Sequence, residues 1–591
     1  MKIQQVLGVC FAAFASLSAG AVLRAEPLEK RATSTSTSAS ASTTSAVADG
    51  SCKNTALTRG CWSNGYSIDT DFDQKFPSTG NTVTYSLEIT NTTCNPDGHG
   101  SRLCLLFNGQ YPGPTIHATW GDNVVVNVKN SMQDNGTSVH WHGVRQYHTP
   151  GQDGVNGVSE CPLAPGDTKT YSFQATQFGT SWYHSHYSAQ YGDGVSGAII
   201  FDGPASANYD IDIGPYPITD WYYQTAAQVN SLALQNLPGL PPSANNVLIN
   251  GTNKNAKGGG SYNQVTLQSG KKYRLRLINT SADNYFRVSI DNHTMLVMTT
   301  DFVPIKPFAA STLLIGIGQR FDVVINANQT AGNYWFRANP ASDCDSQNDF
   351  YGRAVWSYST VTVGTPTSPA WSESSTCLQS QLADPYWYQP FPSGTFSMAA
   401  KDLDLTETDA QVIPGGDTVT VWALGNSTMN VDYEKPTLQY VMDGNTSYAA
   451  EMVIIPTTSE GNWNYWLIQQ ASDAPAVPHP IHLHGHDFYI LGSGSGMYSS
   501  SVSLNYATAI RRDTASVPAS GWLAISFSSN NPGAWLMHCH IAWHASGGLA
   551  VQFLEAPSQI TLPSTSAFEA TCKNWNKYYE TAYWRKDDSG I

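Results

Sequence analysis

Charged residues are scarce in this chain. Asp, Glu, Lys and Arg make up 13% of its 591 residues, whereas typical soluble domains contain about 25%. Positive charge is the scarcer sign, because 30 basic residues stand against 45 acidic ones and the formal net charge is -15 at pH 7. No basic stripe is present that could release counterions from a phosphate backbone, so we expect no nucleic-acid partner and no binding to anionic membranes.

Long apolar runs are also missing beyond the first 25 residues. Residues 1–25 place Lys2 before an apolar stretch that ends in small residues, which is typical of a secretory signal peptide. No later stretch has the roughly 18 uninterrupted apolar residues of a transmembrane helix. Residues 26–51 contain the dibasic pair Lys30 and Arg31, a candidate second processing point, and then a propeptide-like arm rich in Ser, Thr and Ala that cannot bury enough apolar surface to fold. We therefore expect a secreted, extracellular protein without a membrane partner.

Potential glycosylation sites support this compartment. The N-x-S/T sequons lie at Asn91, Asn135, Asn250, Asn279, Asn292, Asn328, Asn426 and Asn445. Such sequons in a secreted chain predict a eukaryotic glycoprotein, although sequons also arise by chance and need not all be occupied.

Cysteines are few and, after processing, odd in number. Of the ten in the sequence, Cys10 leaves with the signal peptide, and an oxidising compartment should pair most of the other nine. At least one therefore stays unpaired. The candidate is Cys539, which stands among three histidines in HCHIAWH (538–544).

The remaining pattern predicts an all-β protein. Short stretches such as 81–90, 123–130, 273–281 and 521–529 alternate apolar and polar residues, and Gly, Pro, Asn and Asp cluster between them. This spacing favours Greek-key β-sandwiches. The chain is too long for one core, and a strand–turn–strand rhythm recurs along it, so we predict three domains at 52–205, 206–385 and 386–591.

Ten of the 15 histidines gather in four short segments: HWH (140–142), HSH (184–186), HPIHLH (479–484) and HCHIAWH (538–544). On a strand, residues i and i+2 point to the same face. Four imidazole pairs result: His140 with His142, His184 with His186, His482 with His484, and His538 with His540. Eight converging imidazoles predict several metal ions.

The same alternation turns Cys539 away from its two histidine neighbours, so it should serve a different metal. Its companions are then the two remaining histidines of these segments, His479 and His544. Two histidines and one cysteine form the ligand set of blue copper. We infer that Cys539 stays unpaired because its thiolate binds copper.

A structural role and a zinc site are the simpler uses of such histidines. A single H-x-H in a β protein is most often structural, and structural zinc prefers four closed ligands with several cysteines, which one cysteine and ten histidines do not provide. Four histidines outside the segments are expected to be ordinary: His99, His117, His148 and His293. For His486, beside the cluster, a supporting role and no role at all are equally open.

The most specific motifs of the chain are HWHGVRQ, SWYHSHYSAQYGDG, HPIHLHGHDFY and NPGAWLMHCHIAWHASGGL. With these motifs the chain resembles the multicopper oxidases, and specifically the ascomycete fungal laccases, over nearly all of residues 52–591. The resemblance implies three cupredoxin-like domains and four copper ions, with O₂ reduced to water by electrons from phenols or aromatic amines. It assigns type 1 copper to Cys539, His479 and His544, and type 2 copper to His140 and His482. It assigns the two type 3 ions to His142, His184 and His540, and to His186, His484 and His538.

The resemblance also implies roles for other residues. Leu549 occupies the axial position at type 1 copper and cannot donate to the metal, which favours a stronger oxidant. His544 is the entry point for electrons. Asp153 is a proton relay near type 2 copper, or else only a turn aspartate before Gly154. The tail DSGI (588–591) enters the solvent channel, with no trimming expected after Ile591.

Disulfides are implied in the same way for Cys52–Cys61, Cys161–Cys572 and Cys344–Cys377, and Cys94 with Cys104 remain as the fourth pair. Two departures from related laccases are visible. Asn245 and Asn246 stand where some have an acid in the phenol pocket, and Ala542 stands where others have an aspartate.

Two alternatives to a laccase remain open. One is another multicopper oxidase activity, either ferroxidase, for which only Asp487 is at hand near the type 1 ligands, or ascorbate oxidase. The other, from a different class, is a copper electron carrier without turnover, which would not need the eight paired histidines. We expect a monomer. Lignin turnover, pigment formation and detoxification of phenols would all use the expected chemistry.

Overall fold

The computed structural model describes residues 52–235, 241–379, 384–388, 392, 402–411, 418–425, 427–457, 461–470 and 474–591. The predicted signal peptide (1–25) and arm (26–51) lie outside the described residues. So does most of the segment 380–401, within which the third domain was predicted to begin.

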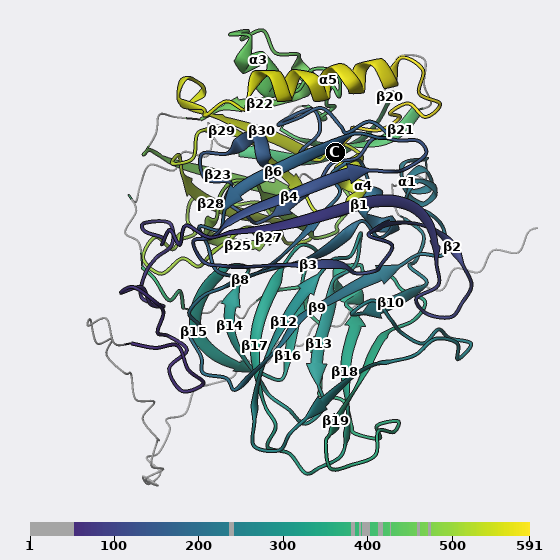
Figure 1. Ribbon diagram of the computed structural model, residues 1–591, viewed down its shortest axis with the longest axis vertical. Coiled ribbons are helices and arrows are strands. Elements are labelled where there is room, and N and C mark those ends of the chain that lie inside the picture. Colours follow the sequence, from purple (N-terminus) through teal and green to yellow (C-terminus); the bar gives the residue numbers. More distant parts are fainter. Residues whose placement is uncertain are drawn as a thin grey trace, which may run out of the picture. The chain divides into compact units, whose positions relative to one another are not determined.

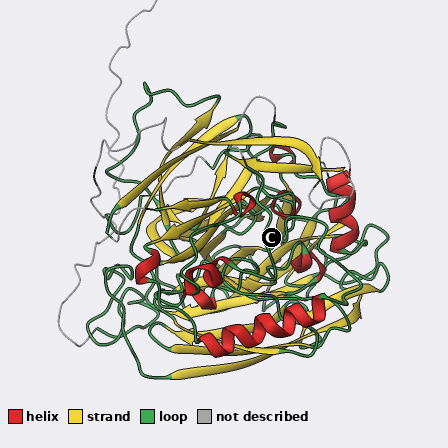
Figure 2. Ribbon diagram, turned by 90° about the horizontal axis from the view of Figure 1, so that it is seen from above, coloured by secondary structure: helices red, strands yellow, loops and turns green. Residues whose placement is uncertain are grey.

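The fold is all-β, as predicted, and its strands form three sandwiches of two sheets each (Figure 1). The sheets of the three sandwiches lie within residues 82–202, 211–358 and 402–555. Figure 2 shows that helices are a minor part of the fold beside strands and loops. The three cupredoxin-like domains are confirmed, while the exact boundaries at 205 and 385 stay predictions.

The first sandwich pairs a β2-β1-β4-β6 sheet with a β3-β8-β7-β5 sheet. Its strands are β1 (Thr82–Cys94), β2 (Arg102–Phe107), β3 (Gly113–Thr119), β4 (Asn123–Asn130), β5 (His140–His142), β6 (Thr168–Gln174), β7 (Gly179–His184) and β8 (Ser196–Asp202). Strands β1 and β4 run parallel, so a crossover connection joins them, while adjacent β4 and β6 run antiparallel. Alternating Val124, Val126 and Val128 of β4 are fully buried in the core between the sheets.

The second sandwich pairs a β10-β9-β12-β17-β14-β15 sheet with a β11-β19-β18-β13-β16 sheet. Its elements are β9 (Ile211–Trp221), α1 (Ala226–Gln235), β10 (Asn246–Ile249), β11 (Asn263–Leu267), β12 (Lys272–Asn279), β13 (Phe286–Ile290), β14 (Met295–Thr300), β15 (Val303–Ala310), β16 (Thr312–Ile315), β17 (Arg320–Asn326), β18 (Asn333–Pro340) and β19 (Gly352–Tyr358). A short turn, residues 316–319, joins β16 to β17.

The third sandwich pairs a β21-β20-β23-β28-β25-β26 sheet with a β22-β30-β29-β24-β27 sheet. Its elements are β20 (Asp402–Gln411), β21 (Thr418–Leu424), α3 (Thr437–Met442), β22 (Ile454–Pro456), β23 (Trp463–Gln470), β24 (His479–Leu483), β25 (Phe488–Ser495), β26 (Arg511–Arg512), β27 (Thr514–Val517), β28 (Gly521–Ser528), β29 (Gly533–Cys539), α4 (Ala542–Ser546), β30 (Ala550–Glu555) and α5 (Thr565–Tyr579). Strands β24 and β29 are buried along their whole lengths, so the histidines and the cysteine that they carry lie inside the protein.

The cysteine predictions are confirmed. The four disulfides are Cys52–Cys61, Cys94–Cys104, Cys161–Cys572 and Cys344–Cys377. Among the cysteines that the structure describes, Cys539 alone is free, and it is buried. The Cys161–Cys572 bond fastens α5 to the first domain. The described residues include no helix long and apolar enough to span a membrane.

One sequon is excluded from glycosylation in the folded chain. The side chain of Asn279 is fully buried, and its amide donates hydrogen bonds to the carbonyl oxygens of Asn284 (2.9 Å) and Ile315 (3.1 Å). Asn279 therefore has a structural role at the end of β12. Asn426 lies outside the described residues.

Candidate metal centre

The unpaired cysteine lies where two strands and a short helix meet. Strand β24 pairs antiparallel with β29, with Ile481 opposite Cys539, and α4 begins three residues after Cys539. The turn that leads into α4 brings the His544 side chain next to Cys539. The Cys539 Sγ atom lies 3.7 Å from Nδ1 of His479 and 3.7 Å from Nδ1 of His544, and the two Nδ1 atoms are 3.1 Å apart. The three predicted ligands thus form one compact donor set.

Burial governs the protonation of this set. It lowers the pKa of His479 to about 3, so the imidazole is neutral and able to bind a metal. Burial likewise raises the pKa of the Cys539 thiol above its ordinary value, so a thiolate forms here only when a bound cation compensates its charge. A soft monovalent or divalent metal held by two imidazoles and one thiolate fits this chemistry.

Leu549 and Trp422 complete the surroundings of the set. Leu549 is fully buried, and its carbonyl accepts a hydrogen bond from the Cys539 amide (3.0 Å). The indole of Trp422 in β21 lies 4.2 Å from the His544 ring, centroid to centroid. Neither side chain carries a charge, so this side of the set is apolar, while the Gln470 amide lies 3.5 Å from Nε2 of His479.

The other eight predicted ligands converge from two domains. Strands β5 and β7 pair so that His140 faces His184, and β24 pairs with β29 so that His482 faces His538. Rings from different domains stack: His140 on His484 at 3.9 Å and His142 on His482 at 3.8 Å. All eight side chains are buried. The first domain supplies His140, His142, His184 and His186, and the third supplies His482, His484, His538 and His540.

Most of these imidazoles are oriented by an oxygen on Nδ1. Backbone carbonyls bond Nδ1 of His140 (Asp153, 2.9 Å), of His184 (Ser185, 2.9 Å), of His482 (Asp513, 2.8 Å) and of His538 (Cys539, 2.8 Å). The Nε2 atoms are thereby left to face the cluster. Those of His140, His184, His186 and His482 find no hydrogen-bond partner among the described residues although they are buried. Buried nitrogen atoms that face each other without partners are what a metal cluster would satisfy.

The donors group at metal-binding spacing. The ligand atoms of His186, His484 and His538 lie within 4.8 Å of one another, and so do those of the His479–Cys539–His544 set. Burial, together with the neighbouring histidines, lowers the pKa of His186 and His484 well below the ordinary value, and burial lowers the pKa of His538 to about 4. All of these imidazoles are therefore neutral, the form that binds metal.

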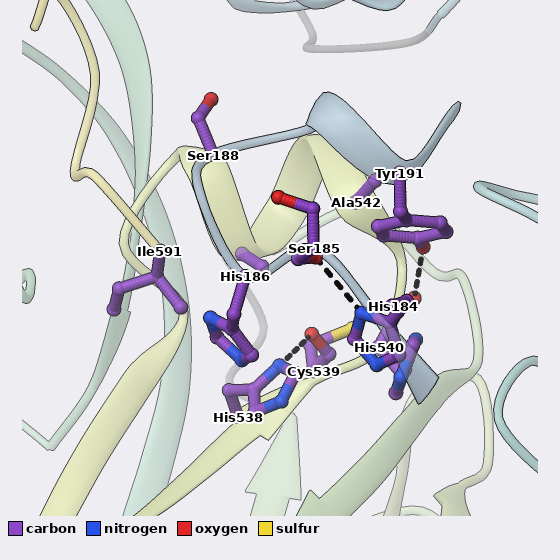
Figure 3. Close-up of a pocket in the computed structure, with 11 residues that line it drawn as sticks. His184, Ser185, His186, Ser188, Tyr191, His538, Cys539, His540, Ala542 and Ile591 are labelled. Atoms are coloured by element: carbon purple, nitrogen blue, oxygen red, sulfur yellow. Dashed lines mark hydrogen bonds between the residues drawn. The ribbon is translucent and has the colours of Figure 1, made fainter. Parts of the chain in front are cut away.

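A cavity adjoins the cluster (Figure 3). Its volume is about 20 Å³, and it is lined by His184, His186, His538, His540 and the last residue, Ile591. The tail that carries Ile591 is anchored: Asn230 of α1 donates to Asp588 (3.0 Å), and the Ser589 amide donates to the Ser546 carbonyl of α4 (2.8 Å). The tail predicted to enter a solvent channel therefore reaches the edge of this cavity.

Asp153 lies directly behind the histidines. Its carboxylate has one oxygen 3.2 Å from Nδ1 of His140 and the other 2.9 Å from Nδ1 of His484, and it is fully buried. Its contacts thus go beyond those of a turn aspartate. They include one histidine that the resemblance assigns to type 2 copper and one that it assigns to type 3.

A second carboxylate was missed by the sequence analysis. Asp513 has Oδ1 3.3 Å from Nε2 of His142 and is ion-paired with Arg320 from the second domain, with two contacts of 2.6 Å. No local sequence pattern marks Asp513 or Arg320, because these two residues and His142 lie more than 170 positions from one another in the chain. Only the tertiary structure brings them together.

The histidines expected to be ordinary lie outside the cluster. His99 stacks on Tyr223, His117 pairs with Asp202 at the surface, and His293 bonds to the Tyr358 hydroxyl. His148 packs beside Tyr147. His486 pairs with Glu555 (2.9 Å), so its contact is with a carboxylate rather than with the predicted ligands.

The residues noted as departures have structural partners. The Asn246 amide donates to Asp97 (2.8 Å), and that of Asn245 donates to Asp349 (3.0 Å). The Asp487 side chain is almost fully buried and lies 3.7 Å from the Arg511 side chain. Asn245 and Asn246 carry no carboxylate and that of Asp487 is shielded from solvent, so these residues give no support to the ferroxidase alternative.

Comparison with known proteins agrees with this geometry. Family models described as multicopper oxidase match residues 88–206, 213–360 and 409–559, one match to each sandwich. The chain is 51% identical over 455 residues to Laccase-3 of Botryotinia fuckeliana, covering 75% of this chain and all of that protein. It is 42% identical over 562 residues to the laccase of Neurospora crassa, covering 91% and 89% of the two chains.

A solved structure is similar as well. The crystal structure of the laccase from Botrytis aclada matches with a TM-score of 0.85 and 41% identity, covering 92% of this chain and all of that one. The three family matches, these relatives and the copper-type donor sets agree with one another. The chain belongs to the multicopper oxidase family and binds copper.

Proposed function

We propose that this chain is a secreted laccase that takes single electrons from phenols or aromatic amines and reduces O₂ to water. The observation that carries the proposal is the continuity of the two donor sets. Cys539 belongs to the first set, and its direct neighbours His538 and His540 belong to the second. One peptide unit on each side of Cys539 therefore connects the two sites covalently.

The donor sets fit four copper ions: one at His479, Cys539 and His544, and three among the eight paired histidines. Copper bound there would supply one-electron oxidation at the first site and O₂ reduction at the second. The buried hydrocarbon side chain of Leu549 would give a copper ion at the first site no fourth donor. This favours a site that is a strong oxidant for its class.

His544 is assigned as the entry point for electrons. It is the most exposed of the three ligands, at 4% against none for His479 and Cys539, and it stands on the short helix α4 at the edge of the third domain. A phenol that docks against the His544 ring edge loses one electron and its hydroxyl proton. Four such oxidations release the four electrons and four protons that convert one O₂ into two waters.

Asp153 is assigned the handling of protons at the cluster. Its carboxylate accepts from the Nδ1–H group of His484 and its backbone carbonyl accepts from that of His140, which keeps both Nε2 atoms free to bind metal. The same carboxylate lies against two histidines of the cluster, so it can hold a proton in transit beside the site of water formation. The tail at Ile591 narrows access to the cavity, which limits the solvent that reaches the cluster.

The remaining elements of the proposal concern the setting of the enzyme. Four disulfides suit an oxidising compartment, and the acidic, weakly charged surface gives no reason to expect a nucleic-acid or membrane partner. We propose that the enzyme acts outside the cell as a monomer.

The visible spectrum of the purified, air-oxidised protein tests the proposal. A strong blue thiolate-to-Cu(II) band is expected, which a methoxyphenol bleaches under nitrogen and air restores. Cys539→Ser should lose the band and keep the copper of the histidine cluster. A copper-loaded but colourless parent protein would refute the assignment of Cys539.

A comparison of O₂ uptake separates the related activities. The methoxyphenol is expected to support faster uptake than Fe(II) or ascorbate at equal concentration. Faster uptake with Fe(II) or ascorbate would replace the laccase proposal by a ferroxidase or an ascorbate oxidase. A blue protein that consumes no O₂ would instead be an electron carrier.

A further inference from the structure

His142 is turned the opposite way from the histidines around it. In His140, His184 and His538 the Nδ1 atom bonds to a backbone carbonyl and Nε2 faces the cluster. In His142 it is Nδ1 that faces the cluster, 3.2 Å from Nε2 of His540. Something on the far side must therefore hold the Nε2 atom of His142.

Two oxygens of the third domain meet that atom. The Oδ1 atom of Asp513 and the Oγ1 atom of Thr514 each lie 3.3 Å from Nε2 of His142. The Thr514 hydroxyl also donates to Asp513 Oδ1 (2.9 Å). A carboxylate oxygen at Nε2 selects the tautomer with a proton on Nε2, which leaves the Nδ1 lone pair for a metal.

Asp513 is held in turn by the second domain, which supplies none of the predicted ligands. Two guanidinium nitrogens of Arg320 donate to its two oxygens at 2.6 Å, and neither side chain is exposed. Such a two-point pair fixes the plane of the carboxylate as well as its position. Asp301 braces both partners, since it accepts from the Arg320 amide (2.9 Å) and from the Asp513 amide (3.1 Å).

The turn before Arg320 touches the cluster directly. A Cβ atom on Gly318 would lie 2.9 Å from the His142 ring and 2.9 Å from the His540 ring, and the residue has φ of +80°. The Gly318 carbonyl accepts from Arg320 (3.1 Å), and the Gln319 side-chain amide donates to the Thr514 carbonyl (3.1 Å). The turn 316–319 therefore packs against the histidines on one side and against residues 513–514 on the other.

We propose that Arg320 is a positioning residue of the copper cluster: through Asp513 it holds His142 with Nδ1 toward the metal. The inference rests on the proposed copper function. Without the guanidinium, the buried Asp513 carboxylate loses its two-point partner and is free to rotate. The His142 ring then loses its fixed acceptor, and the ligand that depends on Nδ1 is no longer preorganised.

The test compares Arg320→Gln with Arg337→Gln in the holoenzyme. Arg337 makes a two-point pair of the same kind with Asp291, at 2.7 and 2.9 Å, in the same domain but among residues that contact no predicted ligand. Removal of a residue that orients a metal ligand weakens metal retention by about 10- to 100-fold. Copper content during stepwise exposure to a chelator, the electron paramagnetic resonance signal of type 2 copper and the blue absorbance are measured for each protein.

Arg320→Gln is expected to keep the blue band of Cys539 while losing cluster copper about 10- to 100-fold more readily than the parent. Arg337→Gln is expected to retain all of its copper. Full retention and an unchanged resonance signal in a folded Arg320→Gln protein would overturn the inference. If that variant does not fold, Asp513→Asn replaces it, because the amide can still accept from Arg320 but presents its NH₂ group to the Nε2–H group of His142.

The same selective loss is expected of Asp513→Asn, and equal retention would again count against the inference. A parent protein without a blue band or O₂ uptake would contradict the proposed function instead. The two failures are therefore distinguishable.

Discussion

Replacement of Asp153 by asparagine probes the cluster without altering its size. The carboxylate accepts from His484 Nδ1 (2.9 Å), and its other oxygen lies 3.2 Å from His140 Nδ1, which donates to the Asp153 backbone carbonyl. Asparagine offers one accepting oxygen, and its NH₂ group must face one of the two imidazole N–H groups. The position is fully buried, so bulk solvent does not relieve the mismatch.

The magnitude follows from the charge-assisted contact that asparagine loses and from the acid that it removes. A hydrogen bond to a charged group contributes about 1.5 to 3 kcal/mol, which corresponds to about 10- to 150-fold in rate. A positioned proton donor contributes about 10²- to 10⁴-fold. Because the two effects share one residue, we expect re-oxidation by O₂ to slow by about 10²- to 10⁴-fold rather than by their product.

Stopped-flow absorbance separates the two halves of the reaction. Under nitrogen, a phenol should bleach the blue band of Asp153→Asn as fast as that of the parent, since Asp153 contacts neither His479, Cys539 nor His544. On mixing with air, the return of the band should be slow. Asp202→Asn, which breaks the surface pair with His117, is the matched control and should leave both phases unchanged. Equal re-oxidation rates in Asp153→Asn and the parent would refute the assignment of Asp153.

Three further predictions concern other parts of the molecule. Leu549→Met conserves side-chain volume and should cost less than about 1.5 kcal/mol of stability. Its thioether should lower the reduction potential of the blue site and slow phenol oxidation. Redox titration of the blue band measures this potential, and an unchanged value would show that residue 549 does not face the metal. Burial raises the pKa of Asp212, but Arg276 and Arg274 outweigh it and bring the pKa to about 2, so the ion pairs stabilise the fold above the unfolded pKa of about 3.9 and the benefit is lost as pH falls toward about 2. Asp212 is exposed, so solvent screens its ion pairs, and Asp212→Asn should lower the free energy of unfolding by only about 1 kcal/mol or less near neutral pH. The difference should close in acid, and a pH-independent difference in thermal unfolding would contradict this. Glycopeptide mass spectrometry should find Asn279 bare while exposed Asn292 is available for glycosylation, and a glycan on Asn279 would contradict its burial.

Much of the copper-binding arrangement was predictable because it depends on local spacing. The i, i+2 rule on strands placed His140 with His142 and His538 with His540 on common faces, and the same rule separated Cys539 from them. The β-class followed from alternation in stretches such as 123–130. The alternation of side chains along a strand is enough to predict these features, so no knowledge of the tertiary structure is required.

The supports of the cluster could not be predicted in this way. Arg320, Asp513 and His142 come from three domains, and no period or motif connects positions so far apart. The burial of Asn279 could not be predicted either, because the sequon sequence is the same whether the Asn side chain faces water or is buried at the end of β12. Contacts of this kind arise from how the sandwiches pack, which residue spacing does not record.

The Cys161–Cys572 disulfide spans 411 positions of the chain, and this has a consequence for biosynthesis. Domains generally fold as they leave the ribosome, amino-terminal first, yet Cys161 has no partner until α5 has been synthesised. Half of the paired histidines lie in the first domain and the other half in the third, so the cluster is complete only after the third domain has been synthesised. Oxidation of this last cysteine pair and loading of the cluster must both follow near-complete translation, so a chain that stops short would keep Cys161 as an unpaired thiol.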